Sequence, residues 1–139
     1  DKDHTEMTYA AAEFLSYRFE RVVIVTPRDR IASDCSLINR QKIYQRLFSR
    51  GVKIITSSEP VDLNDLERGV LRVRNIYNGE LEEIAEVAAI TYSNSRSPDD
   101  ALAKPLEEAG YKVLRVGDCY APRSLLAATG QGFAIGREL

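Results

Sequence analysis

The residues best suited to chemistry lie near the C-terminal end, where Gly117 and Asp118 follow an apolar stretch typical of a buried strand. Pro122 and Arg123 follow at the expected start of a final helix. An acid beside a helix N-terminus can bind a sugar hydroxyl, and the free N–H groups of the helix suit a pyrophosphate or a ribityl oxygen. The alternative is a plain loop in which Asp118 caps the helix. The residue types leave both interpretations open.

The final helix is rich in glycine, at positions 130, 132 and 136. Each glycine inside a helix costs about 1 kcal/mol relative to alanine. A close approach by another backbone or by a cofactor would justify that cost. The alternative is a helix thinned for packing.

No catalytic constellation stands out, because no nucleophile–base pair, metal-ligand cluster, HExxH motif or P-loop is present. Cys35 and Cys119 lie far apart and are expected to be free thiols of a cytosolic protein. His4 is expected to be a solvated loop residue. The net charge of −2, without a basic stripe, argues against a nucleic-acid partner. No apolar run approaches the roughly 20 residues that cross a bilayer, and we expect a cytoplasmic location.

The first half of the chain alternates helical and strand patterns. Asp3 and Glu6 have the spacing of a capping box at the start of a helix over residues 3–18. The β-branched run at 22–25 predicts a strand buried on both faces, typical of parallel sheets. A helix over residues 36–50, ended by Gly51, and a strand over 52–57 follow, which predicts a βαβ unit.

The second half adds antiparallel and terminal elements. Asn78-Gly79 predicts a type I′ turn between strands at 69–77 and 80–84. The remaining expected elements are a buried strand at 87–92, a helix opened by Ser97-Pro98 and closed by Gly110, a strand at 112–116 and a helix from Pro122.

This order predicts an α/β, Rossmann-like (FAD/NAD(P)-binding), three-layer fold with a β-meander. Such a fold normally opens with a central strand and a glycine-rich turn, and both are missing here. The chain starts at Asp1 and enters directly on a helical pattern. We therefore expect it to be a piece of a larger polypeptide, called the parent below.

Residues 117–123, continued by Ala128-Thr129 and Gly132, resemble the terminal signature of the trimethylamine dehydrogenase and 2,4-dienoyl-CoA reductase group. These are NADH:flavin oxidoreductases related to old yellow enzyme. Residues 11–15 and 21–26 resemble the helix and second strand of the inner domain of that group. Residues 90–96 resemble a degraded ATGR-type turn, with Ser93 in place of the glycine.

The resemblance implies a parent in which an FMN-bearing TIM barrel with an iron–sulfur cluster precedes two nested Rossmann-like domains. Residues 1–110 would be an incomplete inner NAD(P)-binding-like domain, and residues 111–139 the terminal strand and helix of the outer FAD- or ADP-binding domain. Gly117, Asp118, Pro122 and Arg123 would then contact FAD or ADP. The resemblance also implies a homo-oligomeric parent enzyme, with no catalytic residue in this chain and no activity for the isolated piece.

The end of the second strand of the inner domain would carry its ribose contacts. Arg28 and Arg30 could bind a 2′-phosphate and favour NADPH, whereas Asp29 could bind a 2′-hydroxyl. The alternative is a solvated charged loop in a domain that has lost nucleotide binding, because residues 1–7 contain no glycine to cradle a phosphate.

Two further interpretations stay open. The chain could be an α/β regulatory or interaction module that binds no dinucleotide, as the absent glycine turn suggests. It could also be an NAD(P)-binding subunit that acts with a separate flavoprotein. The substrate of the parent cannot be read from these residues.

Overall fold

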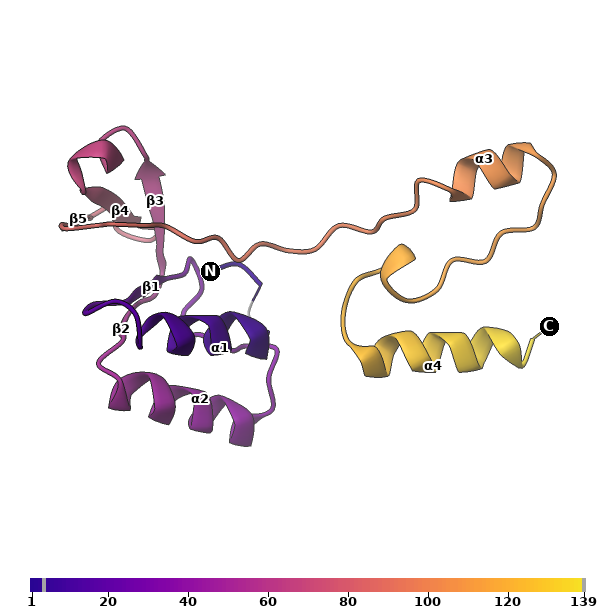
Figure 1. The fold of residues 1–139 in the computed structure, drawn as a ribbon, viewed down its shortest axis with the longest axis horizontal. Helices are drawn as coiled ribbons and strands as arrows, with labels where there is room; N and C mark the ends of the chain where they lie inside the picture. The colour runs from indigo at the N-terminus through magenta and orange to yellow at the C-terminus, as the bar shows by residue number, and fades with distance from the viewer. Residues whose placement is uncertain (4, 139) are drawn as a thin grey trace. The chain divides into compact units, whose positions relative to one another are not determined.

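The computed structural model of the chain describes residues 1–3 and 5–138, so His4 lies outside the described residues. The chain forms two compact units, Asp1–Asn94 (unit 1) and Ser95–Leu139 (unit 2). Each unit is described by itself (Figure 1). The expected boundary at residue 110 concerns the nested domains of the parent and stays a prediction.

Unit 1 begins with the predicted βαβ arrangement. Helix α1 (Glu6–Leu15) precedes strand β1 (Val23–Val25), and helix α2 (Leu37–Ser49) precedes strand β2 (Lys53–Ile55). β1 and β2 pair in parallel, with Ile24 opposite Ile54. The predicted helix at 36–50 is confirmed in detail: the Ser36 hydroxyl accepts from the Asn39 N–H, and Gly51 has a positive φ of 69°.

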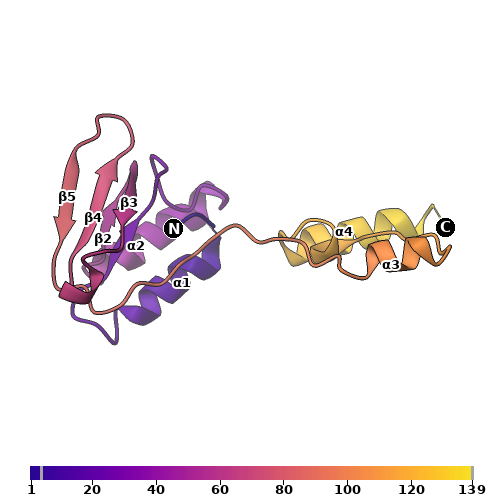
Figure 2. The same ribbon diagram turned by 90° about the horizontal axis from the view of Figure 1, so that it is seen from above.

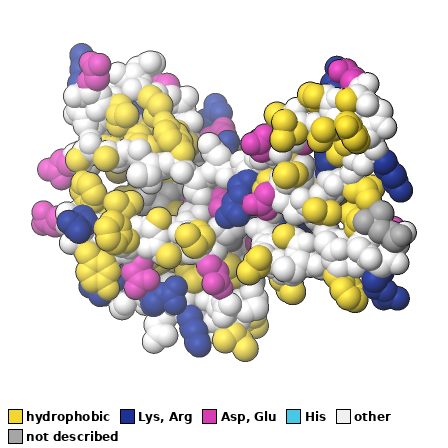
Figure 3. Space-filling model, turned by 45° about the vertical axis from the view of Figure 1, so that its right-hand side comes forward, with side chains coloured by type: hydrophobic (Ala, Val, Ile, Leu, Met, Phe, Trp, Pro, Cys, Tyr) yellow, Lys and Arg dark blue, Asp and Glu magenta, His cyan; other side chains and the backbone are white. Residues whose placement is uncertain are grey.

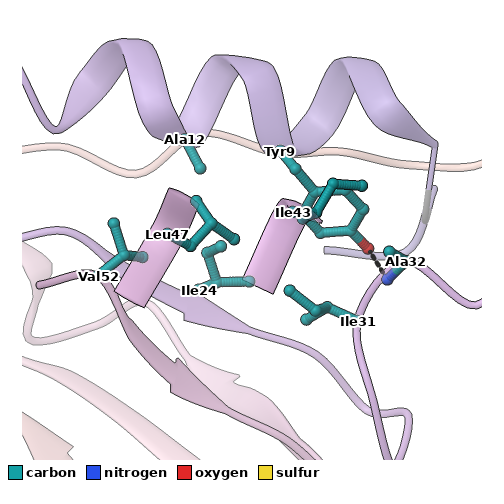
Figure 4. Close-up of a cluster of buried hydrophobic side chains, with 8 residues drawn as sticks. All are labelled: Tyr9, Ala12, Ile24, Ile31, Ala32, Ile43, Leu47 and Val52. Atoms are coloured by element: carbon teal, nitrogen blue, oxygen red, sulfur yellow. Dashed lines mark hydrogen bonds between the residues drawn. The ribbon is translucent and has the colours of Figure 1, made fainter. Parts of the chain in front are cut away.

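The core of unit 1 lies between the two helices and the parallel strands (Figure 4). Burying a side chain the size of leucine or isoleucine contributes roughly 1.5–3 kcal/mol each. The buried residues of this cluster are Tyr9, Ala12, Ile24, Ile31, Ala32, Ile43, Leu47 and Val52. They come from α1, β1, α2 and the connecting loops, so this packing ties the βαβ elements to one another.

A second, three-stranded antiparallel sheet completes unit 1, as Figure 2 shows. Its order is β3 (Ser58–Asp62), β4 (Leu71–Asn75) and β5 (Leu81–Ile84), with a short 3₁₀ helix η1 (Leu66–Arg68) between β3 and β4. The β4–β5 hairpin was predicted, and β3 was not. β3 contains Pro60, which cannot donate to a ladder, and an edge strand tolerates that loss.

The predicted type I′ turn is wrong. Of the two central residues only Gly79 has a positive φ, at 75°, whereas type I′ needs two. The loop is longer: the Asn75 N–H donates to the Glu80 carbonyl, and the Asn75 Oδ1 accepts from the N–H groups of Tyr77 and Asn78. An Asn side chain that binds the backbone two residues on stabilises such a turn locally.

The predicted capping box on α1 is also wrong. Thr5 is the N-cap residue and makes no side-chain cap bond. The Asp3 carboxylate accepts from the Thr5 hydroxyl at 2.7 Å, and the Glu6 carboxylate accepts from the Asn39 side chain at 2.7 Å. Both acids are thus engaged by side chains instead of the helix N-terminus.

Unit 2 contains helix α3 (Ala103–Glu108), a 3₁₀ turn η2 (Gly117–Cys119) and helix α4 (Leu125–Gly136). The helix expected from Pro98 starts later because of Pro105. A helix begun at Pro98 would place Pro105 in its interior, where its ring clashes with a carbonyl one turn earlier. In α3, Pro105 lies in the first turn, and Gly110 follows the helix with a φ of 86°.

The strands expected at 87–92 and 112–116 are not formed among the described residues. Both segments are largely exposed, with Tyr92 at 67% and Leu114 at 44% exposure. A strand needs a neighbour to complete its ladder, and neither segment has a strand partner in the part of the chain that the structure describes. The α/β class is confirmed, whereas the three-layer Rossmann-like arrangement stays a prediction.

Candidate functional site

The Gly117–Cys119 turn is closed by its own backbone bonds and is joined to α4 by a bond to the Gln131 side chain. The Gly117 N–H donates to Gln131 Oε1 at 2.8 Å, and the Gly117 carbonyl accepts from Tyr120 at 3.0 Å and Ala121 at 2.9 Å. Gly117 has a φ of 61°, and a Cβ on it would lie 3.3 Å from Ala128 Cβ. Both the conformation and the close packing therefore favour glycine here.

Asp118 is exposed and carries no hydrogen bond or ion pair among residues 1–3 and 5–138. It does not cap α4, because the Ser124 hydroxyl accepts from the Ala127 N–H at 3.2 Å. The capping alternative for Asp118 is therefore wrong. Its carboxylate is available to a ligand, and the N–H groups of the first α4 residues lack intrahelical acceptors by helix geometry.

Pro122 and Arg123 lie before α4 and do not begin it. The expected helix start at Pro122 is wrong, since Ser124 is the N-cap and Leu125 the first helical residue. The Arg123 carbonyl accepts from Arg96 Nη1 at 3.3 Å, which fixes the backbone of this segment. Pro122 is half-buried, whereas Arg123 is exposed.

The glycines of α4 have no neighbour of the kind expected from the sequence. A Cβ at Gly130, Gly132 or Gly136 would meet nothing within 4 Å. Among the described residues, α4 buries no side chain, and Leu125 and Leu126 are 81% and 83% exposed. No described residue of this chain therefore makes the close approach that would explain glycine at these positions.

The second candidate site follows β1 in unit 1. The Ser57 N–H donates to the Arg28 carbonyl at 2.8 Å, and the Ala32 N–H donates to the Tyr9 hydroxyl at 2.6 Å. Ile31 and Ala32 are fully buried, so the loop that carries Arg28 and Arg30 is anchored at both ends.

Both arginines have weak local partners. Arg28 lies 3.7 Å from Asp34, and Arg30 lies 3.7 Å from Asp29, with all four side chains about half exposed or more. Exposed ion pairs contribute about 0–1 kcal/mol. Either guanidinium could therefore be drawn to a phosphate at little cost, and Asp29 is engaged by Arg30.

The N-terminus of α1 carries a feature that the sequence analysis missed. The Asp1 carboxylate accepts from the Tyr9 hydroxyl at 2.9 Å, and the Asp3 carboxylate binds the Thr5 hydroxyl. A dinucleotide fold places pyrophosphate at this helix end, where two carboxylates would repel it. The sequence does contain a sign of this feature, because acids stand at positions 1 and 3 and residues 1–7 contain no glycine.

Burial raises the pKa of Tyr9 to about 12, which keeps this phenol protonated as donor to Asp1. Burial likewise raises the pKa of the half-buried Cys35 thiol, which disfavours the reactive thiolate. The other cysteine, Cys119, is exposed.

Arg28 and Arg30 belong to unit 1, whereas Gly117, Asp118, Pro122 and Arg123 belong to unit 2. Within the described part of the chain, no three His, Cys, Asp or Glu side chains gather as metal ligands. No helix there has the length and apolar character needed to cross a membrane.

Comparison with family models and with curated proteins finds no match to this sequence. Solved structures do match. Histamine dehydrogenase from Rhizobium sp. 4-9 has a TM-score of 0.79 at 25% identity, over 100% of this chain and 22% of its own. An amine oxidase for 6-hydroxypseudooxynicotine from Pseudomonas geniculata N1 has a TM-score of 0.85 at 20% identity, over 98% and 21%. A 2-naphthoyl-CoA reductase has a TM-score of 0.76 at 21% identity, over 96% of this chain and 20% of its own.

The chain has the fold of one region of these oxidoreductases. It spans about a fifth of the length of each of them. A dehydrogenase, an oxidase and a reductase share this region. The similarity is therefore a similarity of fold and is not tied to one substrate.

Proposed function

We propose that the chain is a C-terminal region of a flavin-dependent oxidoreductase of the amine dehydrogenase, demethylase or enoyl reductase type. The observation that carries the proposal is that nearly the whole chain aligns with a fifth of each of three such oxidoreductases. The likeness of residues 117–132 to the terminal signature of the trimethylamine dehydrogenase group supports the same assignment from the sequence.

In this proposal, the Gly117–Arg123 segment contacts FAD or ADP in the outer domain. Asp118 is solvent-facing and unengaged among the described residues, so it can accept from a ribose or ribityl hydroxyl. The first N–H groups of α4 can donate to a phosphate oxygen. Gly117 lets the turn pack on Ala128, so the turn that carries Asp118 lies against α4.

Unit 1 offers weaker support for NAD(P)H. Arg28 and Arg30 could take a 2′-phosphate and favour NADPH, but Asp1 and Asp3 lie where the pyrophosphate would bind. We propose that unit 1 contributes mainly structure, and that any nucleotide binds it weakly.

The reacting groups would lie elsewhere in the parent. FMN and an iron–sulfur cluster, held by other parts of the parent, would supply the redox chemistry, and no residue of this chain would hold either group. This chain supplies no catalytic residue in the proposal; its residues bind and orient the second nucleotide. We further propose a cytoplasmic, homo-oligomeric parent.

A second candidate is an interaction module without nucleotide binding. The carboxylates of Asp1 and Asp3 at the start of α1 favour it, since they would repel a phosphate at this helix end. The third possibility, a separate NAD(P)-binding subunit, predicts a short native polypeptide, whereas the main proposal predicts one several times longer than this chain.

The decisive experiment uses the native polypeptide. Its absorption spectrum and the cofactors released on denaturation should show FMN together with FAD or ADP. Asp118→Asn should then lower the retained FAD or ADP while FMN stays, and Glu107→Gln, an exposed acid on α3, is the matched control. A native polypeptide free of flavin refutes the proposal. Calorimetric titration of the 139-residue chain with ADP, FAD, NADH and NADPH separates the alternatives, because tight binding of any one excludes the interaction module.

A further inference from the structure

Helix α2 carries exposed hydrophobic side chains on a side that does not face the core of unit 1. Ile43 and Leu47 belong to that core, at 2% and 1% exposure. Leu37, Ile38 and Phe48 are instead 59%, 66% and 61% exposed. In Figure 1, α2 forms the lower border of unit 1. Apolar side chains gathered on one exposed surface, unlike single scattered ones, mark an interaction surface.

Four residues of α2 form a stripe with the spacing of a coiled-coil seam. They are Leu37, Gln41, Tyr44 and Phe48, separated by four, three and four positions. At about 100° and 1.5 Å per residue, they lie within about 60° of one another around the helix, over a length of about 16 Å. The rings of Tyr44 and Phe48 stack, with centroids 5.7 Å apart. This stripe is called the α2 seam below.

The α2 seam carries no charge. Gln45 and Ile38 adjoin it, so that an arc of about 120° of the helix is uncharged. The basic residues of α2 lie outside this arc, and they are Arg40, Lys42 and Arg46. Arg46 is already bonded to Glu13 of α1, at 3.0 Å. The centre of a protein interface is typically poor in charge and rich in aromatic residues, and the α2 seam has this composition.

The α2 seam fits a second copy of itself better than it fits an acidic partner. Lys42 and Arg46 lie more than about 120° from the centre of the seam, so acids on a partner would reach only Arg40. An identical seam brings no charge into the contact. A two-fold interface uses the same surface on both copies, and therefore requires a surface that is complementary to itself.

We propose that α2 is a self-association surface, on which the α2 seams of two copies pack antiparallel about a two-fold axis. The axis passes close to residues 42 and 43, which places Leu37 against Phe48 of the second copy and Gln41 against Tyr44 of the second copy. The antiparallel arrangement also sets the two helix dipoles in a favourable orientation. The inference deepens the homo-oligomeric parent of the proposed function, because it names the surface that joins two copies.

Gln41 and Tyr44 give the contact its register. The Tyr44 hydroxyl accepts from the Ile31 N–H at 3.3 Å, and its own proton has no acceptor among residues 1–3 and 5–138. The side-chain carbonyl of Gln41 on the second copy would accept that proton. A polar residue within a seam specifies register and partner orientation in coiled coils.

The size of the contact sets its strength. One pair of helices in contact over about 16 Å buries less than the roughly 1,200 Å² at which stable interfaces begin. We therefore expect the 139-residue chain to dimerise weakly, with a Kd of about 10–100 μM.

Photo-cross-linking tests the contact in the native polypeptide. With p-benzoylphenylalanine in place of Phe48, irradiation should give a product of twice the mass. After trypsin digestion, the fragment of residues 47–50 should be joined to the fragment of residues 31–40, which contains Leu37. Positions 37 and 48 of one helix are about 16 Å apart, so this product forms only between two copies. The same group in place of Lys42, outside the α2 seam, is the control and should give no such product.

Every other cross-link from position 48 contradicts the proposal. A link to another segment of the same polypeptide means that the parent covers its own seam. A link to the fragment of residues 47–50 of the second copy means that the helices are parallel. A link to a different protein, or no link, means that the seam does not bind a second copy.

Matched variants of the 139-residue chain separate α2 from α4, whose leucines are also exposed. In analytical ultracentrifugation, Phe48→Glu should raise the Kd of the dimer by about tenfold or more, because it places two charges in the contact. Gln41→Glu, which is nearly isosteric, should raise the Kd as well. Leu126→Glu, at an 83% exposed position of α4, is the control and should leave the Kd unchanged. Loss of the dimer in Leu126→Glu with an unchanged Kd in Phe48→Glu overturns the proposal.

The same experiments distinguish this inference from the proposed function. A native polypeptide without flavin that gives the link from position 48 to residues 31–40 removes only the proposed function. A flavin-bearing native polypeptide that does not give this link refutes only the self-association surface.

Discussion

Units 1 and 2 differ in how many hydrophobic side chains they bury. Unit 1 encloses a cluster of eight buried side chains drawn from two helices, a strand and connecting loops. In the described part of unit 2, Ala103 is the only buried hydrophobic residue, and Leu126 and Phe133 are 83% and 68% exposed. Hydrophobic side chains accordingly show at the surface in Figure 3.

The difference has a physical consequence. Burial of apolar surface is the main favourable term in folding, so unit 1 carries its own stability and unit 2 carries little. A helix of 12 residues with no buried side chain, such as α4, is marginal in water. Unit 2 therefore gains little stability from contacts among its own described residues, whereas unit 1 has a core of its own.

Leu47→Ala should cause the largest loss of unfolding free energy. Leu47 is 1% exposed in the core of unit 1, so its truncation should cost about 2–5 kcal/mol of unfolding free energy. Leu126→Ala, in the exposed face of α4, is the matched control and should stay within about 0.5 kcal/mol. Urea unfolding of the 139-residue chain measures both, and equal losses would show that unit 2 has a core of its own.

Tyr9→Phe should have the next largest effect. The Tyr9 hydroxyl accepts from the Ala32 N–H at 2.6 Å, and phenylalanine would leave that buried N–H without an acceptor. The expected loss is about 1–3 kcal/mol, measured by urea unfolding at pH 7. Tyr17→Phe, at an exposed tyrosine outside the core, is the control, and a loss as large there would contradict this account.

The same phenol predicts a pH dependence. Burial raises the pKa of Tyr9 from 10.0 to about 12, so the folded chain holds this proton more tightly than the unfolded chain. Its contribution is complete below pH 10 and is lost as the pH rises from 10 towards 12. The free energy of unfolding should therefore fall more steeply between pH 10 and 12 in the wild type than in Tyr9→Phe. Parallel pH profiles would show that the Tyr9 pKa is not raised.

The parts of the fold predicted correctly have local signals. The α2 cap at Ser36, the end at Gly51 and the β-branched run of β1 follow from neighbouring residues alone. The strands expected at 87–92 and 112–116 had the right composition and failed, because a strand depends on a partner that the local pattern does not contain. β3 was not predicted, because Pro60 disfavours a strand in the local pattern. Its pairing with β4, which the local pattern does not contain, forms the strand all the same.

The candidate site divides in the same way. Gly117 has a positive φ and packs on Ala128, and its predicted contact with a cofactor stays a prediction. The roles of Asp118, Arg123, Arg28 and Arg30 stay predictions, because a ligand contact depends on groups outside this chain. Asp3 and Glu6 were predicted to form a capping box, and no role was predicted for the Asp1 carboxylate, which accepts from the Tyr9 hydroxyl.

Gly117→Ala tests whether unit 2 has any specific structure of its own. Alanine at a φ of 61° costs about 1–2 kcal/mol, and its Cβ would press on Ala128. Gly132→Ala is the matched control, since it lies in α4 with open space around it, and it should stabilise the helix by up to about 1 kcal/mol. Opposite shifts in the thermal unfolding of α4, followed by circular dichroism, are expected. Two shifts of the same sign would mean that the turn does not hold α4.

Ser124→Ala should give the smallest loss of stability, and this loss should be confined to the first turn of α4. The Ser124 hydroxyl accepts from the Ala127 N–H, and loss of such a cap costs about 1 kcal/mol. The effect should appear as faster hydrogen exchange of the first α4 amides, with no change in the core amides of unit 1, because the two units do not share that core. Ser124→Asp keeps an acceptor at the cap and should restore the protection. If the alanine variant also loosens Ile43 and Leu47, the units unfold together, and the contrast between a self-supporting unit 1 and a dependent unit 2 fails.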